Sequence, residues 1–140
     1  MFETGRALLM VPPDLPEPFA DNVAIAWDGS REAARAVAAA LPILRRAAKV
    51  EVMTAQYSSV TARPSEVAQY LARHGVETQT WAFTPGRGPI GKELMIQCAE
   101  AGVNLLVMGA YGHSRFREMV LGGATRGIIT NAALPVLMAH

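Results

Sequence analysis

The sequence has little of what marks a secreted, membrane-spanning or nucleic-acid-binding protein. It contains one cysteine, Cys98, so no disulfide can form within the chain. No basic start followed by an apolar h-region indicates a signal peptide, and no apolar run approaches the about eighteen residues that cross a bilayer. Thirteen basic and twelve acidic residues leave a net charge of +1, which does not indicate a nucleic-acid surface. These absences predict a soluble, cytoplasmic protein that binds neither membranes nor nucleic acids.

What is present is an alternation of strand-like and helical segments over one domain-sized chain of 140 residues, of which 51% are hydrophobic. The expected strands are residues 23–27, 50–55, 77–83, 103–108 and 135–140. The expected helices are residues 31–48, 64–75, 89–102 and 124–133. Such alternation predicts an α/β fold, with an open, doubly wound, mostly parallel sheet and helices on both of its faces.

Single residues give the boundaries and surroundings of these elements. Ser30 is placed to cap the first helix, and Pro42 is expected to kink or split that helix because it lacks a backbone donor. Residues 77–83 mix aromatic and polar side chains like an edge strand, and Pro135 suits the start of another edge strand. Cys98 lies on the apolar stripe of its helix, which predicts a packed core residue rather than a reactive thiol.

The first 22 residues have a different composition from the domain expected at 23–140. A strand-like "ALLMV" is followed by four prolines within residues 12–18, which is typical of a stiff linker. The segment "RALLMVP" is similar to the chain's own "LPVLMAH". We therefore interpret residues 1–22 as an extra strand and linker, the remnant of a preceding repeat in a tandem protein; a chance match of two short apolar segments is the alternative.

The predicted sheet also indicates where a ligand binds. In open α/β sheets, ligands lie beyond the carboxyl ends of the strands, where the strand order reverses. Asp28 follows the first predicted strand there, and the glycine-rich "GAYGHSRFREMVLGGATRG" follows the fourth. Its glycines let backbone amides approach an anion, and the pair Gly122 and Gly123 lies where the last helix begins, so both amides and helix dipole favour a phosphate.

Together these features resemble the universal stress protein family. The resemblance covers residues 23–140 and rests on "AWDGS", on "LLVMGAYGHS", on the nine residues between Gly112 and Gly122 of "LGGATR", and on the closing "PVLM". It implies a five-stranded parallel sheet of order 3-2-1-4-5 and a homodimer formed through the last strand, residues 135–139. The tandem interpretation offers a preceding domain as the other pairing partner.

In nucleotide-binding members of the family, the matching positions surround ATP or a related adenine nucleotide (ADP or AMP), with or without Mg²⁺. The resemblance puts Asp28 beside the base and ribose, Ala55 beside the adenine, and Met108 along the base pocket. It puts Gly109 and Gly112 under the ribose and phosphates. It puts four further residues around the phosphate chain: Gly122, Gly123, Ala124 and Thr125.

One position departs from the family pattern, because Gly123 stands where a serine or threonine is usual. Losing a hydroxyl bond to a charged phosphate costs roughly 1.5–3 kcal/mol, or about ten- to a hundredfold in affinity. Thr125 or one of the arginines at 115, 117 and 126 could compensate. The segment thus predicts a pocket with the shape for a nucleotide more strongly than it predicts a high affinity for that nucleotide.

Two classes of function remain open on the sequence. In the first, adenine-nucleotide binding alters an interaction with partners during stress. In the second, the domain binds no nucleotide and serves as a dimeric interaction module. A third, ATP hydrolysis, ranks lower, because no general base or metal-binding carboxylate pair accompanies the loop. The sequence therefore predicts no enzyme, no catalytic residue and no metal site.

Overall fold

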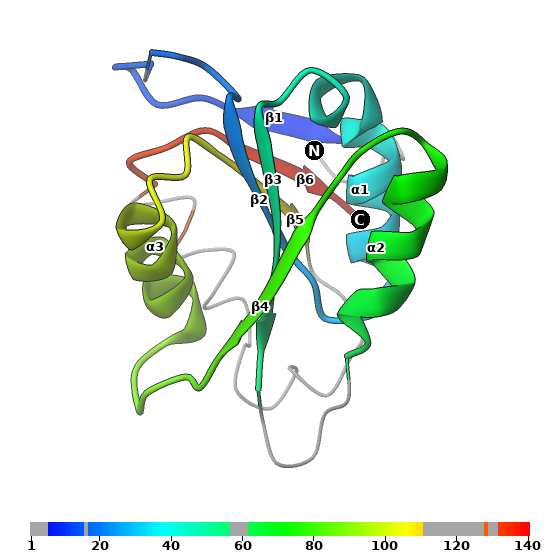
Figure 1. Ribbon diagram of the computed structural model, residues 1–140. Helices are drawn as coiled ribbons and strands as arrows, with labels where there is room; N and C mark the ends of the chain where they lie inside the picture. Colours follow the sequence, from blue (N-terminus) through cyan, green and yellow to red (C-terminus); the bar gives the residue numbers. More distant parts are fainter. Residues whose placement is uncertain (1–5, 16, 57–61, 111–127, 129–131) are drawn as a thin grey trace.

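The protein is a mostly parallel β-sheet between layers of helix (Figure 1). The computed structural model describes residues 6–15, 17–56, 62–110, 128 and 132–140. The strands are β1 Leu8–Met10, β2 Asn22–Ala26, β3 Lys49–Ala55, β4 Gln79–Phe83, β5 Leu105–Gly109 and β6 Val136–Ala139. The helices are α1 Arg31–Leu44, α2 Pro64–Arg73 and α3 Ile90–Glu100. Within these residues, no helix is long and apolar enough to cross a membrane.

The sheet confirms the predicted α/β class and the order of its five parallel strands. Its order is β1-β6-β5-β2-β3-β4. The strands β4, β3, β2, β5 and β6 correspond to the predicted 3-2-1-4-5, and each neighbouring pair among them is parallel. As predicted, β4 lies at one edge, where three of its five residues are exposed.

The other edge corrects the prediction of a five-stranded sheet. A sixth strand, β1, pairs antiparallel with β6, with Leu9 opposite Leu137. Because β1 covers it, β6 is an interior strand with all four residues buried, and Pro135 does not begin an edge strand as expected. The strand-like character of "ALLMV" was visible in the sequence, but its pairing is a contact between distant segments that no local pattern specifies.

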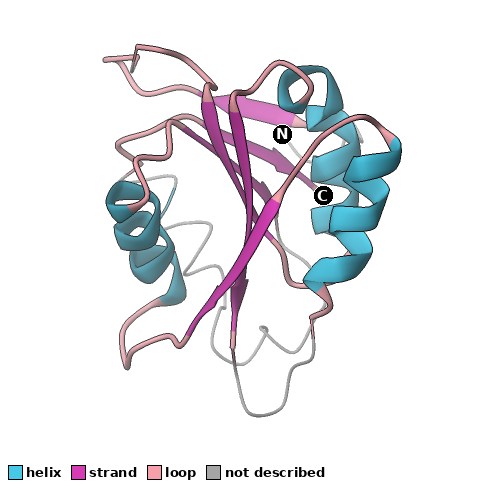
Figure 2. Ribbon diagram, viewed as in Figure 1, coloured by secondary structure: helices cyan, strands magenta, loops and turns pink. Residues whose placement is uncertain are grey.

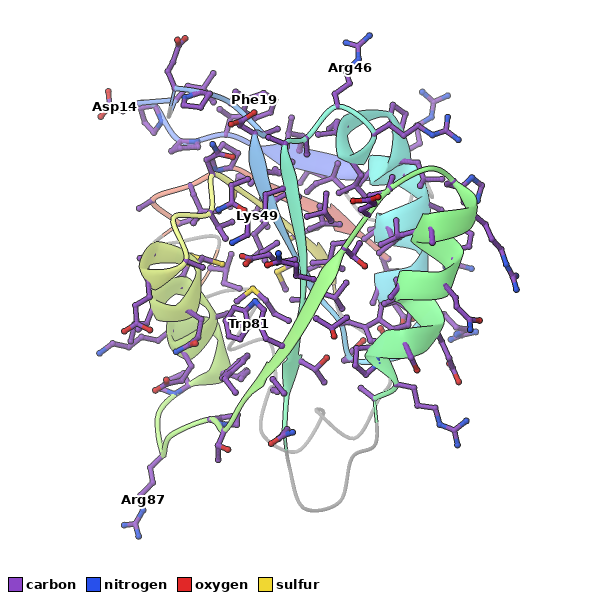
Figure 3. All side chains as sticks on the ribbon, viewed as in Figure 1. Asp14, Phe19, Arg46, Lys49, Trp81 and Arg87 are labelled. Carbon is purple, nitrogen blue, oxygen red and sulfur yellow. The ribbon has the colours of Figure 1, made fainter. Side chains whose placement is uncertain are left out.

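Helices cover both faces of the sheet, as predicted (Figure 2). Alternate side chains of each strand point to opposite faces, so Val23 and Ile25 of β2 face α1 and α2, while Ala24 faces α3. On the α3 side, Trp81 of β4 packs against the apolar cluster that also contains Cys98, and Figure 3 shows its ring between β4 and α3. The sheet is therefore held by one apolar core on each face.

Cys98 lies wholly in this second core, as its place on the helical stripe predicted. Burial, and secondarily the nearby Glu51 carboxylate, raises the pKa of the Cys98 thiol to about 12. A thiol with such a pKa stays protonated at neutral pH and is a poor nucleophile. Cys98 acts as a core residue.

The ends of the helices follow the local chemistry of the sequence. Ser30 caps α1, since its Oγ accepts a hydrogen bond from the amide of Ala33 at 3.1 Å. Pro64 occupies the first turn of α2, and Gly75 follows that helix with φ +76°. Pro42 does not split α1: it lies in the last turn, and the helix continues to Leu44. The predicted helix at 124–133 falls outside the described residues, apart from Ile128, Ala132 and Ala133.

Candidate functional site

The candidate site is the edge of the sheet formed by the carboxyl ends of β2, β3 and β5. These strands are adjacent and parallel, with Ala26 of β2 opposite both Met53 of β3 and Met108 of β5. The chain leaves β2 toward β3 on one side and returns as β5 on the other, so the strand order reverses at β2. This is the predicted switch point, and the polar turn after β2 and the end of β5 meet there.

Asp28 lies in the turn between β2 and α1 and is half buried. Its Oδ1 accepts a hydrogen bond from the amide of Ser30 at 2.9 Å, and Gly29 between them has φ +76°. This Asx turn places Ser30 to cap α1. Asp28 therefore has a structural role in the turn, in addition to the ligand role that the sequence predicts.

Gly109 ends β5 against the first turn of α1. A Cβ atom at this position would lie 2.6 Å from the amide nitrogen of Ala33 and 2.9 Å from the carbonyl carbon of Glu32. Both are backbone atoms, which cannot move aside without shifting the helix. Packing alone therefore requires glycine at position 109, independently of any phosphate.

Ala55 ends β3, and Met108 directly precedes the last residue of β5; both side chains lie on the face of the sheet covered by α3. Met108 is buried in that core, and Ala55 packs against it, half buried. The structure therefore places Asp28, Ala55, Met108 and Gly109 along one edge, on three adjacent strands or just beyond them. The remaining predicted site residues lie outside the described residues: Gly112, Gly122, Gly123, Ala124 and Thr125.

Two buried polar atoms on neighbouring strands at this edge have no hydrogen-bond partner among the described residues. They are Nε1 of Trp27, the residue before Asp28, and Oγ1 of Thr54, the residue before Ala55. The amide of Trp27 bonds to the carbonyl of Met53 at 2.9 Å, which continues the β2–β3 pairing beyond Ala26. An unpaired buried donor costs about 1–3 kcal/mol, so such groups mark places where a ligand or water completes the bonding.

The sequence did not single out Thr54, and for Trp27, beside the proposed pocket, it favoured simple burial over packing against a base. The available signal was their position, because each directly precedes a predicted site residue at the end of a strand. Whether their polar atoms have hydrogen-bond partners depends on the tertiary structure and is not visible in the sequence.

Sequence reasoning also missed Glu32, which is 4% exposed in the first turn of α1. It lies in the first turn of the helix, and the Nη2 atom of Arg31 lies 3.8 Å from its Oε1. Asp28 and Glu32 thus bring two acidic side chains to the α1 end of the site.

His140 also lies beside the end of β5. Its ring Nδ1 is 3.0 Å from the carbonyl oxygen of Ala110, and its own carbonyl accepts a hydrogen bond from Arg35 of α1 at 3.0 Å. The amide of Ala110 in turn bonds to the carbonyl of Ala139 at 2.8 Å. These contacts fix the backbone that immediately follows Gly109.

The described part of the site has the chemistry of a binding site. It offers an acidic turn, two buried polar atoms that lack a partner in this part of the chain, and the ends of three adjacent strands. Among the described residues, no group of three or more His, Cys, Asp or Glu side chains is placed to hold a metal ion. The fold is a doubly wound α/β domain, and this edge, at its switch point, is its candidate ligand site.

The chain belongs to the universal stress protein family, whose sequence model matches residues 20–140. Universal stress protein Slr1230 of Synechocystis sp. is 46% identical over 35 residues, which cover 25% of this chain and 12% of that protein. The matched stretch is thus a small part of the curated relative.

Solved structures of universal stress proteins share the fold. One from Archaeoglobus fulgidus has a TM-score of 0.75 at 17% identity; the match covers 99% of this chain and 50% of that one. The chain therefore spans about half the length of that relative. A universal stress protein solved in complex with cAMP has a TM-score of 0.65 at 23% identity, covering 86% of this chain and 96% of that one. The likeness at these identities establishes the architecture.

Proposed function

We propose that this domain binds an adenine nucleotide across the carboxyl ends of β2, β3 and β5, and that its occupancy regulates partners in a stress response. One observation carries the proposal: Asp28 and Ala55 lie at the ends of two neighbouring strands beside the switch point, each preceded by a buried polar atom without a partner among the described residues. A universal stress protein of similar fold has been solved with cAMP, an adenine nucleotide, which supports this ligand class.

Each part of the nucleotide has a candidate partner. We assign the adenine to the backbone at Ala55 and to the apolar surroundings of Met108, and the ribose to the Asp28 carboxylate. On the sequence argument alone, we assign the phosphates to the glycine segment, namely Gly112 and the residues from Gly122 to Thr125. Because Asp28 and Glu32 add negative charge near α1, we expect ATP, ADP or AMP to bind more tightly with Mg²⁺ than without it.

The second candidate function is an interaction module without nucleotide, and Gly109 favours it. Since packing against α1 accounts for glycine at this position, the first glycine of the segment is no evidence for a phosphate. In either case we propose a binding protein of the cytoplasm and no enzyme. The lone cysteine, kept protonated in the core, supports a reducing compartment.

The two candidates are separated by calorimetric titration of the purified chain with ATP, ADP, AMP and cAMP, each with and without Mg²⁺. The nucleotide proposal expects saturable heat with at least one of them. Absence of heat at millimolar concentration of all four would leave the interaction module as the function.

Asp28→Asn tests the site itself. The amide oxygen of asparagine still accepts the hydrogen bond from Ser30, so the turn and the folding stability should be retained. The charge that would bind the ribose is lost, and we expect the affinity for ATP to fall about tenfold by titration.

The matched control is Asp21→Asn. Asp21 is exposed at the opposite end of β2, so this variant makes the same charge change away from the site and should bind ATP like the unmodified chain. Equal affinities for the two variants would contradict a role of Asp28 in binding. A tighter Asp28→Asn would mean that this carboxylate faces the phosphates instead of the ribose.

A further inference from the structure

The edge of the sheet formed by β4 has no strand on its outer side among the described residues. Figure 1 shows β4 at the front of the sheet, with α2 beside it. Three of its five residues are exposed, and none of the five is charged or a proline. Charged side chains and prolines are two of the devices that protect an edge strand from pairing. The β4 edge is therefore open to a further strand.

The free backbone groups of this edge belong to alternate residues of β4. The amide of Gln56, just beyond β3, donates to the carbonyl of Phe83 at 2.8 Å, so Phe83 bonds toward β3. Successive residues of a strand direct their N–H and C=O groups to opposite sides, so Trp81 also bonds toward β3. Thr80 and Ala82 then present their backbone groups on the outer side. A strand laid beside β4 would pair with these two residues.

A groove of about 730 Å³ lies along the same edge, between α2 and β4. Thr78 and Thr80 line it, because their side chains alternate with that of Trp81, which packs on the α3 face. The opposite wall is one stripe of α2, made of small residues apart from Gln69: Pro64, Ser65, Ala68 and Ala72. Thr80 thus borders the groove with its side chain and offers its backbone at the edge.

The dimensions of the groove suit an extended peptide. A strand added to β4 would direct every second side chain over the groove, since side chains alternate between the two faces of a sheet. The small residues of α2 leave room for those side chains. The ten residues of α2 span about 15 Å, which is the length of about five residues of extended chain.

The groove carries a charge at one end only. Glu77 is the one charged residue among those that line it, and it is exposed just before β4. It forms no ion pair with another described residue. A carboxylate without a counter-ion, at the end of an uncharged groove, favours an occupant with a basic side chain at that end.

A second copy of this chain would fill the groove poorly. Two β4 strands paired about a two-fold axis would bring Thr80 and Ala82 of the second copy to the α2 side, and these side chains are small for a groove of about 730 Å³. Neither residue would bring a positive charge to Glu77. An extended peptide with longer side chains and a lysine or arginine meets both requirements.

We propose that the β4 edge and the groove beside α2 bind an extended segment of a partner protein, which adds a strand to the sheet. The segment is about five residues long, is uncharged in its middle and has a lysine or arginine at the end next to Glu77. Its backbone pairs with Thr80 and Ala82, and every second side chain enters the groove. None of these residues belongs to the candidate ligand site, so the inference is independent of nucleotide binding.

The test uses the full chain and three fluorescently labelled peptides of alternating valine and threonine. The first has a lysine at both ends and should show saturable binding by fluorescence anisotropy. The second has glutamates at both ends and should bind about fivefold more weakly, because Glu77 repels it. The third has the lysines but methylated backbone nitrogens, so it keeps the side chains without the N–H donors and should not bind.

Thr80→Pro tests the pairing from the side of the protein. Proline removes the outward N–H and puts its ring where the added strand would lie, while the bonds that Trp81 and Phe83 direct toward β3 are kept. The affinity for the lysine peptide should fall at least about tenfold. The matched control is Thr80→Val, which keeps the backbone amide and should bind like the unmodified chain.

Glu77→Gln tests the charged end of the groove. We expect it to weaken binding of the lysine peptide about two- to fivefold, as for an exposed ion pair. Glu66→Gln makes the same charge change on α2, where Glu66 pairs with Arg63 and does not line the groove, and should leave the affinity unchanged.

Several outcomes would overturn the inference. One is no saturable binding of the lysine peptide at millimolar concentration, and another is equal binding of the methylated and unmethylated peptides. Equal affinities of Thr80→Pro and Thr80→Val would exclude pairing at this edge. A dimer of the unmodified chain that Thr80→Pro dissociates would make a second copy the occupant. If Thr80→Pro does not fold by circular dichroism, the methylated peptide on the unmodified chain decides the question.

Discussion

Gly109 shows how one residue can meet a packing demand and a functional prediction at the same time. From the sequence, Gly109 is interpreted as a residue that lets a phosphate approach the backbone closely. The structure supplies a second reason, since β5 and the first turn of α1 approach so closely that a Cβ would lie 2.6 Å from a backbone nitrogen. Contact between these two elements brings the end of β5 beside the Asp28 turn.

Gly109→Ala should therefore destabilise the fold even without ligand. The added methyl group must push β5 away from α1, and overpacking of this kind costs about 1–3 kcal/mol. Urea unfolding measures the loss.

Gly88→Ala is the control, because a Cβ there would lie 3.6 Å from the nearest atom, an ordinary contact with a flexible Glu93 side chain. Its unfolding midpoint should stay close to that of the unmodified chain. Equal unfolding midpoints for the two variants would show that α1 yields to the methyl group at no cost.

At the scale of the element, the helices were the most predictable parts and the ends of the sheet the least. Ser30, Pro64 and Gly75 mark helix boundaries through hydrogen bonds and backbone angles that depend on a few neighbouring residues. The last strand was predicted to lie at an edge because Pro135, just before β6, suits the first position of an edge strand. Its actual neighbour, β1, is more than a hundred residues away along the chain. Pairing at that separation depends on which apolar segment packs beside β6 in the folded protein, and local sequence patterns do not specify this.

Ser30→Ala tests how far α1 depends on its cap. The Ser30 hydroxyl accepts the bond from the Ala33 amide, and its loss should cost about 1 kcal/mol of the free energy of unfolding. Ser65 lies in the first turn of α2, but no side chain caps that helix, so Ser65→Ala should change stability by less than half as much. A larger effect at Ser65 would contradict this assignment of the cap.

For the whole molecule, the buried thiol of Cys98 links stability to pH. Its pKa is raised from 9.0 to about 12 in the folded protein, mainly by burial. Below pH 9 the thiol is protonated in both states and the ionisation does not affect folding. Above pH 9 the unfolded chain releases the proton while the folded chain keeps it, so stability falls until about pH 12.

Cys98→Val should remove this part of the alkaline destabilisation. With an unfolded pKa of 9.0, the cysteine contributes a loss on the order of 1 kcal/mol between pH 7 and pH 10, which the variant lacks. Urea denaturation at both pH values gives the two differences. Identical pH dependence in the two proteins would mean that the folded thiol ionises near its ordinary pKa.

The sequence by itself determined the class of the fold, the described helices and parallel strands, and the parallel order implied by its family resemblance; it also predicts the edge at which a ligand binds. Each of these depends on hydrophobic period, turn chemistry or motif spacing, which are properties of short stretches of the sequence. Only the tertiary structure decided that β1 closes the β6 edge, that α1 demands glycine at 109, and that Trp27 and Thr54 keep polar atoms beside the site without a partner among the described residues. Those facts depend on which distant backbone and side-chain atoms come within contact distance, and that is decided when the whole sheet packs.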